Sequence, residues 1–429
     1  MTKDDIILGR YAKGFLPSGE GAYTAVFSQV GEQFAQKYIK ELEKADYRLY
    51  SSSEFCGESC ERKNIFALYE SETHTVSLGF HSYADRMYVT YTPKKEGWVL
   101  PPVQKPEYKA LGDKYPTILT QIGLERFHPT CVSMCYVLRA ADGTFVIIDS
   151  DVGDTEDVIY DVLKKQAPDP DNIVISAWFF THPHGDHMGG FVKFAEKYAN
   201  DDTVTLKQVV LNVPELDLLP EHEAALAMKT VLGAKSFGDD VTFVRAHAGD
   251  ILYYADLTFR VLYTQEEYTA VSDTPDSNCC SIVTQMETDS GVKVLFGADH
   301  AVRGNYNGLL FCEGAIYKWY GDFIKSDVVT CFHHGFGGGA DDNVYKVIKP
   351  TVVFWPVTYF RLYKNEYGEP YGSPVTEYSI NQYFYDPEQA KANGVRACYV
   401  SGDKIQIMDL SNNDLSVTEY EHCDIYLAK

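Results

Sequence analysis

The nearly continuous apolar run from Asn172 to Phe180 is the feature that most restricts how this 429-residue chain can fold. A run of this length and composition predicts a strand that is buried on both faces. The run stops abruptly at residues 181–188, a loop in which histidines and an aspartate crowd together. Strands of this kind belong to sheets covered on both sides, so a layered α/β fold is the first expectation.

Strand-like and helix-like segments alternate around this run. Residues 134–139 and 144–148 flank Ala141-Asp142-Gly143 and predict a hairpin. Thr155 suits the N-cap of one helix and Gly233 the end of another. The helical patterns lie at 155–165, 190–198, 224–232, 315–324, 343–348 and 387–392, and further strand-like segments at 204–212, 242–245, 257–262, 281–286, 292–296, 328–332 and 351–356. This order predicts an α/β fold with a sheet sandwich.

Residues 21–102 predict a separate small α+β unit. Apolar residues at helical spacing predict one amphipathic helix, formed by Phe27, Val30, Phe34, Tyr38 and Leu42. Three stretches rich in β-branched and aromatic residues follow as strands, at 65–69, 76–80 and 87–91. The sequence thus predicts an N-terminal α+β domain, residues 1–128, and a catalytic domain, residues 129–429, with an extension from about residue 359. The N-terminal domain has no assigned role, because a lid over the cleft and a dimerisation unit are equally consistent with its sequence.

The charge balance is strongly acidic, with 38 Lys and Arg against 61 Asp and Glu and a net charge of −23. Such a surface repels phosphate backbones, so a nucleic-acid partner is disfavoured and a small-molecule substrate is expected. Met1 to Gly9 contains no basic and apolar pattern of a signal peptide, and no long apolar run predicts a membrane span. We therefore expect a cytoplasmic protein without a membrane association, in which a homo-oligomer remains open and the cysteines are reduced.

The loop after the apolar run carries the residues with the clearest chemistry: His182, His184, Asp186 and His187. Imidazole and carboxylate groups are ligands that zinc and other divalent metals prefer. Side chains two apart in an extended loop point the same way, so His182 and His184 can hold one ion. Asp186 and His187 follow where the loop turns into a helix, and can face a second ion. A surface loop that holds histidines by chance is the competing interpretation, and the position of the cluster at the end of a buried strand argues against it.

Residues 182–190, HPHGDHMGG, resemble the HxHxDHxGG signature of the metallo-β-lactamase superfamily. Asp149, at the end of a predicted strand, resembles the aspartate that braces the histidine loop. Asp299, after a strand that ends in Phe296-Gly297, is similar to the aspartate that bridges two metals. His333-His334-Gly335 resembles the terminal motif whose histidine completes the second metal. The resemblance spans Met134 to Pro356 and implies the αββα sandwich of this family.

The resemblance also implies a set of site residues. The metal ligands would be His182, His184, Asp186, His187, Asp299 and one of His333 and His334. Catalytic roles would fall to Asp186, Asp299 and His300. The cofactors would be two divalent ions, zinc in the first place, with manganese or iron as alternatives. Many family members have a third histidine on the first metal, and here His222 and His247 are the candidates, although neither lies in a motif.

The region from Asn278 to Ser281 and the terminal histidine pair narrow the resemblance to one branch. They are similar to the nuclease-like domain of bacterial DNA-uptake competence proteins and to phosphorylcholine esterases. The expected reaction is attack of a metal-bound hydroxide on a phosphodiester or a phosphorylated small molecule. Two alternatives stay open: a carboxylic ester, lactone or thioester hydrolase on the same site, and a metal-binding interaction module without turnover. The di-iron redox branch is disfavoured, because its members have Glu at the position of His184 and an added flavin domain.

Overall fold

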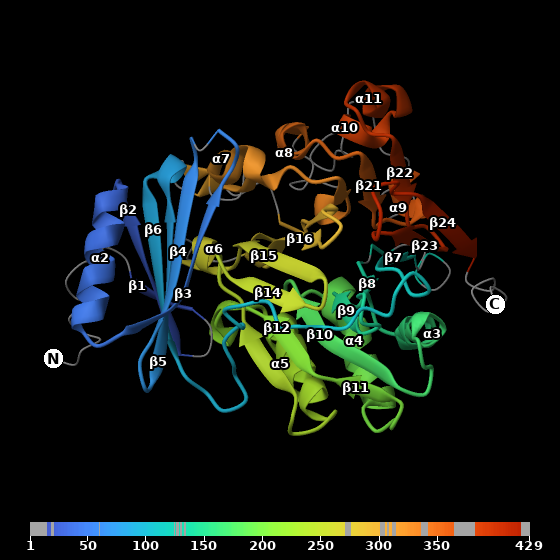
Figure 1. Ribbon diagram of the computed structural model, residues 1–429, viewed down its shortest axis with the longest axis horizontal. Helices are drawn as coiled ribbons and strands as arrows, with labels where there is room; N and C mark the ends of the chain where they lie inside the picture. Colours follow the sequence, from blue (N-terminus) through green and yellow to red (C-terminus); the bar gives the residue numbers. More distant parts are fainter. Residues whose placement is uncertain are drawn as a thin grey trace.

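The protein is described by a computed structural model, which covers residues 15–18, 21–59, 61–123, 125, 128, 131–132, 134–270, 276–300, 305–306, 309–310, 315–335, 342–363 and 382–421. Within these ranges the chain forms three large sheets and a small two-stranded one (Figure 1). Residues 1–9, which carry the prediction about a signal peptide, lie outside this part of the chain. None of the described helices combines the length and the apolar character needed to cross a bilayer.

The first sheet is antiparallel and has the order β1-β2-β6-β5-β4-β3. Its strands are β1 (Phe15–Ser18), β2 (Ala22–Ser28), β3 (Arg48–Cys56), β4 (Lys63–Glu70), β5 (His74–His81) and β6 (Arg86–Pro93). Helix α2 (Glu32–Lys44) lies against this sheet and buries Tyr38 and Leu42 there. The helix begins later than the sequence predicts, because Phe27 belongs to β2 and pairs with Met87. Phe27 and the apolar side chains of α2 pack in the same core. Their spacing in the sequence therefore resembles that of a single amphipathic helix.

The second sheet contains the predicted buried strand at its centre. Its order is β13-β12-β10-β9-β8-β7-β23-β24, with β11 also paired to β10. The strands are β7 (Ile118–Ile122), β8 (Tyr136–Arg139), β9 (Phe145–Ile148), β10 (Ile173–Phe180), β11 (Val204–Leu206), β12 (Gln208–Leu211), β13 (Thr242–Arg245), β23 (Lys404–Asp409) and β24 (Val417–Glu421). Strand β10 runs parallel to β9 and β12, and its apolar side chains, except the partly buried Val174, are buried on both faces, so the prediction for this run is confirmed.

The third sheet faces the second and has the order β14-β15-β16-β17-β20-β21-β22. Its strands are β14 (Ile251–Tyr254), β15 (Leu257–Tyr263), β16 (Val283–Thr288), β17 (Lys293–Phe296), β20 (Val328–Thr330), β21 (Val352–Trp355) and β22 (Ala397–Val400). The small sheet pairs β18 (Asn305–Tyr306) with β19 (Leu309–Leu310). One hydrophobic core joins the two large sheets, with Phe179 of β10 packed on Phe259 of β15.

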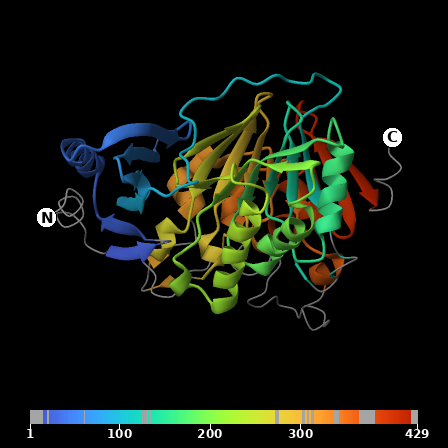
Figure 2. The same cartoon turned by 90° about the horizontal axis from the view of Figure 1, so that it is seen from below.

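Helices cover the outer faces of this sandwich (Figure 2). On the second sheet lie α3 (Glu156–Gln166), α4 (Gly185–Tyr198) and α5 (Glu221–Lys235), and Trp178 packs there against Phe191 and Phe194. The remaining helices are α6 (Glu266–Thr269), α7 (Ala315–Tyr320), α8 (Asp342–Ile348), α9 (Tyr359–Tyr363), α10 (Gln382–Tyr385) and α11 (Pro387–Ala392), with 3-10 turns η1 (Ser82–Ala84), η2 (Leu216–Leu218), η3 (Asn278–Cys280), η4 (Gly321–Ile324) and η5 (Phe332–Gly335). The fold is an αββα sandwich with an additional N-terminal α+β unit, as predicted.

Two local predictions about helix ends need correction, and a third is confirmed in position only. Helix α4 begins at Gly185, five residues before the predicted start at residue 190. Helix α5 continues through Gly233 to Lys235, because this glycine serves packing: a Cβ there would lie 3.0 Å from Cβ of Ala195 on α4. Thr155 does occupy the N-cap position of α3, but its hydroxyl donates to the Val152 carbonyl instead of accepting from the helix.

The described residues near the C-terminus, 382–421, include strands of the sandwich. Strand β23 pairs with β7 and β24, and β22 extends the third sheet beside β21. We propose that the chain divides into an N-terminal and a catalytic domain as the sequence predicts, with β7 contributed from the N-terminal side of the boundary at residue 128.

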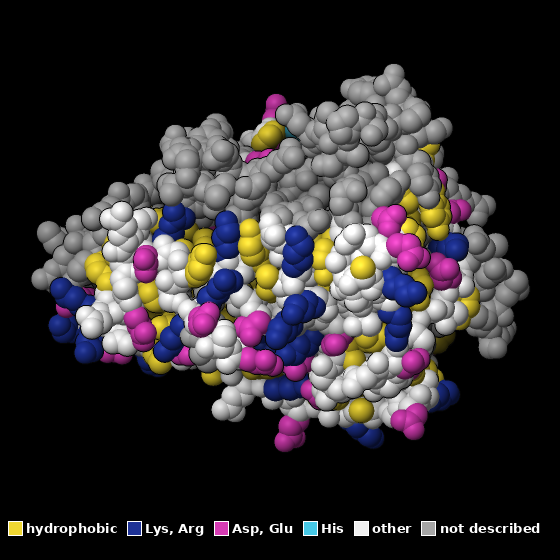
Figure 3. Space-filling model, turned by 90° about the horizontal axis from the view of Figure 1, so that it is seen from above, with side chains coloured by type: hydrophobic (Ala, Val, Ile, Leu, Met, Phe, Trp, Pro, Cys, Tyr) yellow, Lys and Arg dark blue, Asp and Glu magenta, His cyan; other side chains and the backbone are white. Residues whose placement is uncertain are grey.

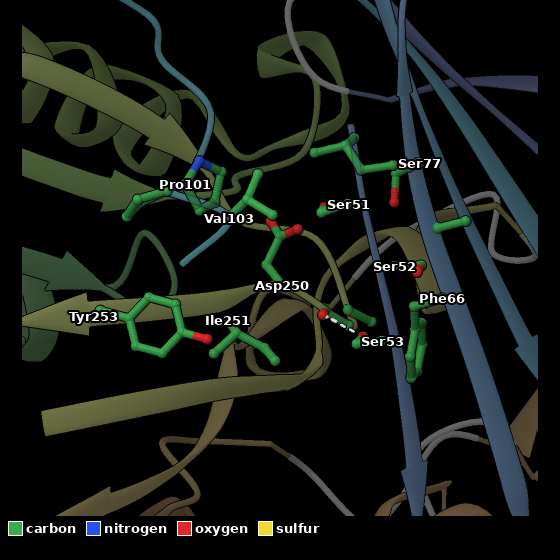
Figure 4. A pocket seen from close by; sticks show the side chains of 15 residues that line it. Ser51, Ser52, Ser53, Phe66, Ser77, Pro101, Val103, Asp250, Ile251 and Tyr253 are labelled. Atoms are coloured by element: carbon green, nitrogen blue, oxygen red, sulfur yellow. Dashed lines mark hydrogen bonds between the residues drawn. The ribbon is translucent and has the colours of Figure 1, made fainter. Parts of the chain in front are cut away.

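The N-terminal sheet packs directly on the sandwich next to β14 (Figure 4). The Ser53 hydroxyl donates to the Gly249 carbonyl over 2.6 Å. A Cβ at Gly249 would lie 2.1 Å from the Phe66 side chain, and the residue has φ +94°, so only glycine fits this contact. Asp250 projects into the same junction, where burial raises the pKa of its carboxyl to about 6.

Candidate metal centre

The site lies where several strands of both sheets end. Strand β9 leads into Asp149, and β10 leads into the histidine loop and α4. From the third sheet, β17 leads to Asp299 and β20 to His333 and His334. The chain turns sharply at these ends, with φ between +46° and +57° at Asp149, Ala298, His333 and His334. Such conformations are costly for residues other than glycine and gather at functional sites.

Two clusters of metal-ligating side chains meet at this edge. The first contains His182, His184 and Asp299, and the second contains Asp186, His187, Asp299 and His334. Within each cluster the ligand atoms lie within 4.8 Å of one another. Asp299 belongs to both, and its Oδ2 lies 3.3 Å from His187 Nε2 and 3.9 Å from His182 Nε2. Two clusters that share one carboxylate have the arrangement of a site for two neighbouring cations.

Polar atoms in these clusters fit a bound cation. The Nε2 atoms of His182, His187 and His334 and the Oδ1 atom of Asp299 are buried and have no hydrogen-bond partner among the described residues. Buried polar atoms that make no hydrogen bond are costly, and here four of them converge on one place, with His187 and His334 at ion-pair distance from Asp299. Divalent metal ions, which accept nitrogen and carboxylate ligands together, would satisfy these atoms.

In three histidines of the clusters, a protein group lies beside Nδ1, the ring nitrogen opposite the unpartnered Nε2. Asp149 contacts His187 Nδ1 at 2.7 Å and also accepts from the Thr181 amide and hydroxyl at 2.9 and 2.8 Å. The Pro356 carbonyl lies 2.7 Å from His334 Nδ1. His182 Nδ1 lies 3.2 Å from the Ser281 hydroxyl. These contacts fix the ring orientations and leave each Nε2 directed into the centre.

The electrostatics of the clusters favour a cation. Burial, with neighbouring His187 and His184, lowers the pKa of His182 well below its usual value, so this ring is neutral. Burial also acts to lower the pKa of His334, but Asp299 and Asp186 outweigh it and raise the value to about 10. Burial acts to raise the pKa of Asp299, but His334 and His187 hold it well below its usual range. Cation binding would therefore displace protons from the second cluster.

The two histidines of the terminal motif differ in position. His334 is buried, and its Nε2 lies 3.2 Å from Asp186 and 3.4 Å from Asp299. The His333 side chain is 27% exposed, with Nε2 3.9 Å from Asp299 and 3.3 Å from Nδ2 of Asn278. The geometry favours His334 as the ligand and leaves His333 at the edge of the site. This choice was open in the sequence.

The other predicted residues lie apart from the two clusters. His300 is buried between the rings of Tyr263 and Phe332, at 4.3 and 6.4 Å between ring centroids. The His222 side chain is 83% exposed. His247 is buried, and its Nδ1 lies 2.9 Å from Glu266. Neither His222 nor His247 joins a cluster within the described ranges, and the catalytic role of His300 stays a prediction.

One neighbour of the site has no counterpart in the sequence motifs. Glu223, a buried residue of α5, places Oε1 3.4 Å from Nε2 of His184. The residue lies in the first turn of a helix, where acidic side chains are common for electrostatic reasons alone. No local pattern therefore distinguished it, and only the packing of α5 against α4 brings it to the histidine loop.

A family model described as the metallo-beta-lactamase superfamily matches residues 128–207, which contain Asp149 and the histidine loop. No match was found among curated proteins. Over residues 128–207 the chain is therefore similar to the metallo-β-lactamase superfamily, and the candidate metal-binding residues of this segment meet those of the third sheet at one edge.

Several solved structures are similar at low identity. Zn(2+)-bound PqqB from Methylobacterium extorquens is 11% identical, with a TM-score of 0.38 over 65% of this chain and 88% of that one. A long-form RNase Z from yeast is 10% identical, with a TM-score of 0.34 over 79% of this chain and 50% of that one. A metallo-beta-lactamase from Cronobacter sakazakii is 13% identical, with a TM-score of 0.29 over 46% of this chain and 73% of that one. Because these TM-scores are low, the similarity to the superfamily rests on the matched segment, residues 128–207.

Proposed function

We propose that this protein is a metal-dependent hydrolase that cleaves a phosphodiester or another phosphorylated small molecule with two divalent ions. The observation that carries the proposal is the pair of clusters that share Asp299. His182, His184 and Asp299 would hold the first ion, and Asp186, His187, Asp299 and His334 the second. The mixture of imidazole and carboxylate suits zinc, and manganese or iron as alternatives. Such ions activate a water molecule and polarise the oxygen of the scissile group.

The residues in and around the clusters would have different roles in the reaction. Asp299 is buried, so it would balance the charge of both ions and would exchange no proton with solvent. The Asp186 side chain is 20% exposed, which lets it orient the attacking water and pass a proton outward. His333, at the edge of the site, can contact the leaving group or a phosphoryl oxygen. We propose Asp186 and Asp299 as catalytic residues and retain His300 as a candidate proton donor behind them.

A cysteine nucleophile is not needed for this reaction. Cys331 follows β20 directly and lies close to the terminal histidines in the chain. It is buried, and burial raises the pKa of its thiol well above the usual value. A buried thiol that keeps its proton is inert, so the chemistry points to direct attack by water.

The choice of substrate rests on the terminal His333-His334-Gly335 motif, which resembles the phosphodiesterase branch, and on the surface charge. The chain carries a net charge of −23. On the face drawn in Figure 3, basic and acidic side chains are interspersed in the part that the structure describes. A duplex needs an extended basic surface, whereas a small phosphorylated molecule needs only the positive field of the metal centre.

A substrate panel tests the proposal. Metal-free protein, reloaded with zinc or manganese, would be assayed with bis-p-nitrophenyl phosphate, a phosphorylcholine ester, a lactone and a thioester. We expect turnover of the phosphodiesters, loss of turnover on chelation, and its return when metal is added back. Turnover of the lactone or thioester alone would overturn the phosphodiesterase assignment. Activity that survives complete removal of metal would overturn the metal-dependent mechanism, and no turnover of any substrate would favour an interaction module.

A further inference from the structure

The histidines of the centre do not all face it in the same way. His182, His187 and His334 have Nδ1 beside a protein oxygen, which leaves Nε2 for a metal. His184 differs from these three, because its Nε2 is the ring nitrogen that lies near a protein oxygen. Oε1 of Glu223 is 3.4 Å from it. If that nitrogen carries the proton directed at the carboxylate, the remaining nitrogen, Nδ1, is the one available as a metal ligand.

Glu223 is held in place from its other side. The Ser277 hydroxyl donates to Oε2 of Glu223, and both side chains are buried. A carboxylate buried to this degree is costly unless it is paired, and its Oε1 has two imidazoles nearby. His184 is the nearer of the two, and His222 lies 3.7 Å away on an exposed side chain. The interaction of Glu223 with His184 is therefore less exposed to solvent than the one with His222, and a lower local dielectric makes it the stronger of the two.

We propose that Glu223 is a positioning residue for the first metal: it accepts the Nε2 proton of His184 and directs Nδ1 of that ring toward the ion. The inference rests on the metal binding in the proposed function, but not on the identity of the substrate. It also answers a question that the sequence left open. Among the described residues neither His222 nor His247 joins a cluster, and the first cluster has three candidate ligands against four in the second. A fixed His184 ring would compensate for the smaller number of ligands at the first metal, because the side chain loses less conformational freedom when the ion binds.

A purely structural role for Glu223 is the competing interpretation. An acidic residue in the first turn of α5 stabilises the helix through its dipole, and Glu221 does so in the same turn. Glu221 is exposed, so Glu221→Gln is a matched control for the helix effect. Glu223→Ala removes the acceptor, whereas Glu223→Gln keeps an amide oxygen that can accept the same hydrogen bond.

The first measurement is metal affinity, by zinc titration in competition with a chromophoric chelator. We expect the wild type to bind two equivalents. Glu223→Ala weakens one equivalent by about 10- to 100-fold and leaves the other unchanged. Glu223→Gln weakens it by less than about 10-fold, and Glu221→Gln behaves as the wild type. Should Glu223→Ala not fold, Glu223→Asp, which withdraws the carboxylate by one methylene, is expected to weaken the same equivalent.

The second measurement is the protonation pattern of the imidazoles, from long-range ¹H–¹⁵N spectra of the zinc-loaded protein. We expect His184 to carry its proton on Nε2, and His182, His187 and His334 on Nδ1. Three results would overturn the inference: wild-type affinity for both equivalents in Glu223→Ala, equal losses in Glu223→Ala and Glu223→Gln, or a proton on Nδ1 of His184. A wild type that binds no metal would instead refute the proposed function.

Discussion

Each histidine that we propose as a metal ligand is oriented by a neighbouring group on the side of its ring away from the proposed metal position. Asp149 holds His187, the Pro356 carbonyl holds His334, and the Ser281 hydroxyl lies beside His182. At the residue scale, metal affinity therefore depends on these neighbours as well as on the ligands. Variants of Asp149, which contacts His187, and of the pair His333 and His334 test this dependence.

Asp149→Asn tests the neighbour of His187. Asparagine can still accept from the Thr181 amide, but its NH₂ group cannot accept the Nδ1 proton of His187 in the same pose. We expect the affinity for one metal equivalent to fall by about 10- to 100-fold, measured by competition with a chelator. Asp154→Asn, at an exposed position, is the control. Unchanged affinity in Asp149→Asn would show that the contact is not functional.

Replacing the two terminal histidines separately tests their different positions. His334→Ala removes a buried ring next to Asp186 and Asp299, so we expect the loss of one metal equivalent and of activity. His333→Ala removes a partly exposed ring, so both equivalents should remain while kcat falls. Metal analysis by mass spectrometry and steady-state kinetics measure the two effects. The opposite pattern would exchange the roles of the two residues.

At the scale of elements, the site depends on how closely α4 approaches the loop after β9. Gly190 lies in α4, and a Cβ there would be 1.9 Å from the Ser150 carbonyl oxygen. The Ser150 amide and hydroxyl both donate to the His187 carbonyl, at 2.7 and 2.8 Å. The helix that presents Asp186 and His187 is thereby fixed to the loop that presents Asp149.

Gly190→Ala is expected to destabilise the protein by about 1–3 kcal/mol, because the new methyl group overlaps a backbone atom that cannot move aside easily. Metal affinity should fall as well, since the helix and the loop must separate. Urea denaturation followed by circular dichroism measures the stability. Gly185→Ala in the same helix is the control, because nothing lies within 4 Å of its added Cβ. Equal stability of both variants would contradict this account of the packing.

At the scale of the whole molecule, the N-terminal sheet packs against the sandwich close to a group of buried acids. Asp250 lies at that junction, and Glu266 and Glu267 lie in the short helix α6. Burial, and after it the charge of Glu266, raise the pKa of Glu267 to about 8 from an ordinary value of 4.5. The Glu267 Oε2 atom accepts from the Thr264 amide and hydroxyl.

The folded protein thus keeps a proton on Glu267 that the unfolded chain loses above its ordinary pKa. Stability from this group is fully present below about pH 4.5 and declines as the pH rises to about 8. Glu267→Gln has no proton to lose, and its amide oxygen can accept from Thr264. We expect its stability relative to the wild type to increase by about 1–3 kcal/mol between pH 5.5 and 8.5, measured by thermal denaturation. Exposed Glu388→Gln should show no such trend, and a constant difference for Glu267→Gln would refute the prediction.

Much of this protein was determined by its sequence. The run from Asn172 to Phe180 is apolar at successive positions, which a strand buried on both faces requires, and the structure confirms it. The motif residues could be identified because they follow strands directly and occur in a fixed order. Parallel strands end at a common edge, so side chains at such ends are brought together by any fold of this class.

The tertiary structure decided the features that depend on distant contacts. The left-handed conformations at His333 and His334 turn only the second ring into the centre. The packing of α5 on α4 brings Glu223 to His184, and β23, near the end of the chain, closes the second sheet beside β7. The physical reason is the same in each case: a local sequence sets periodicity and chemistry, whereas ring orientation and pairing between distant segments follow from how the elements pack.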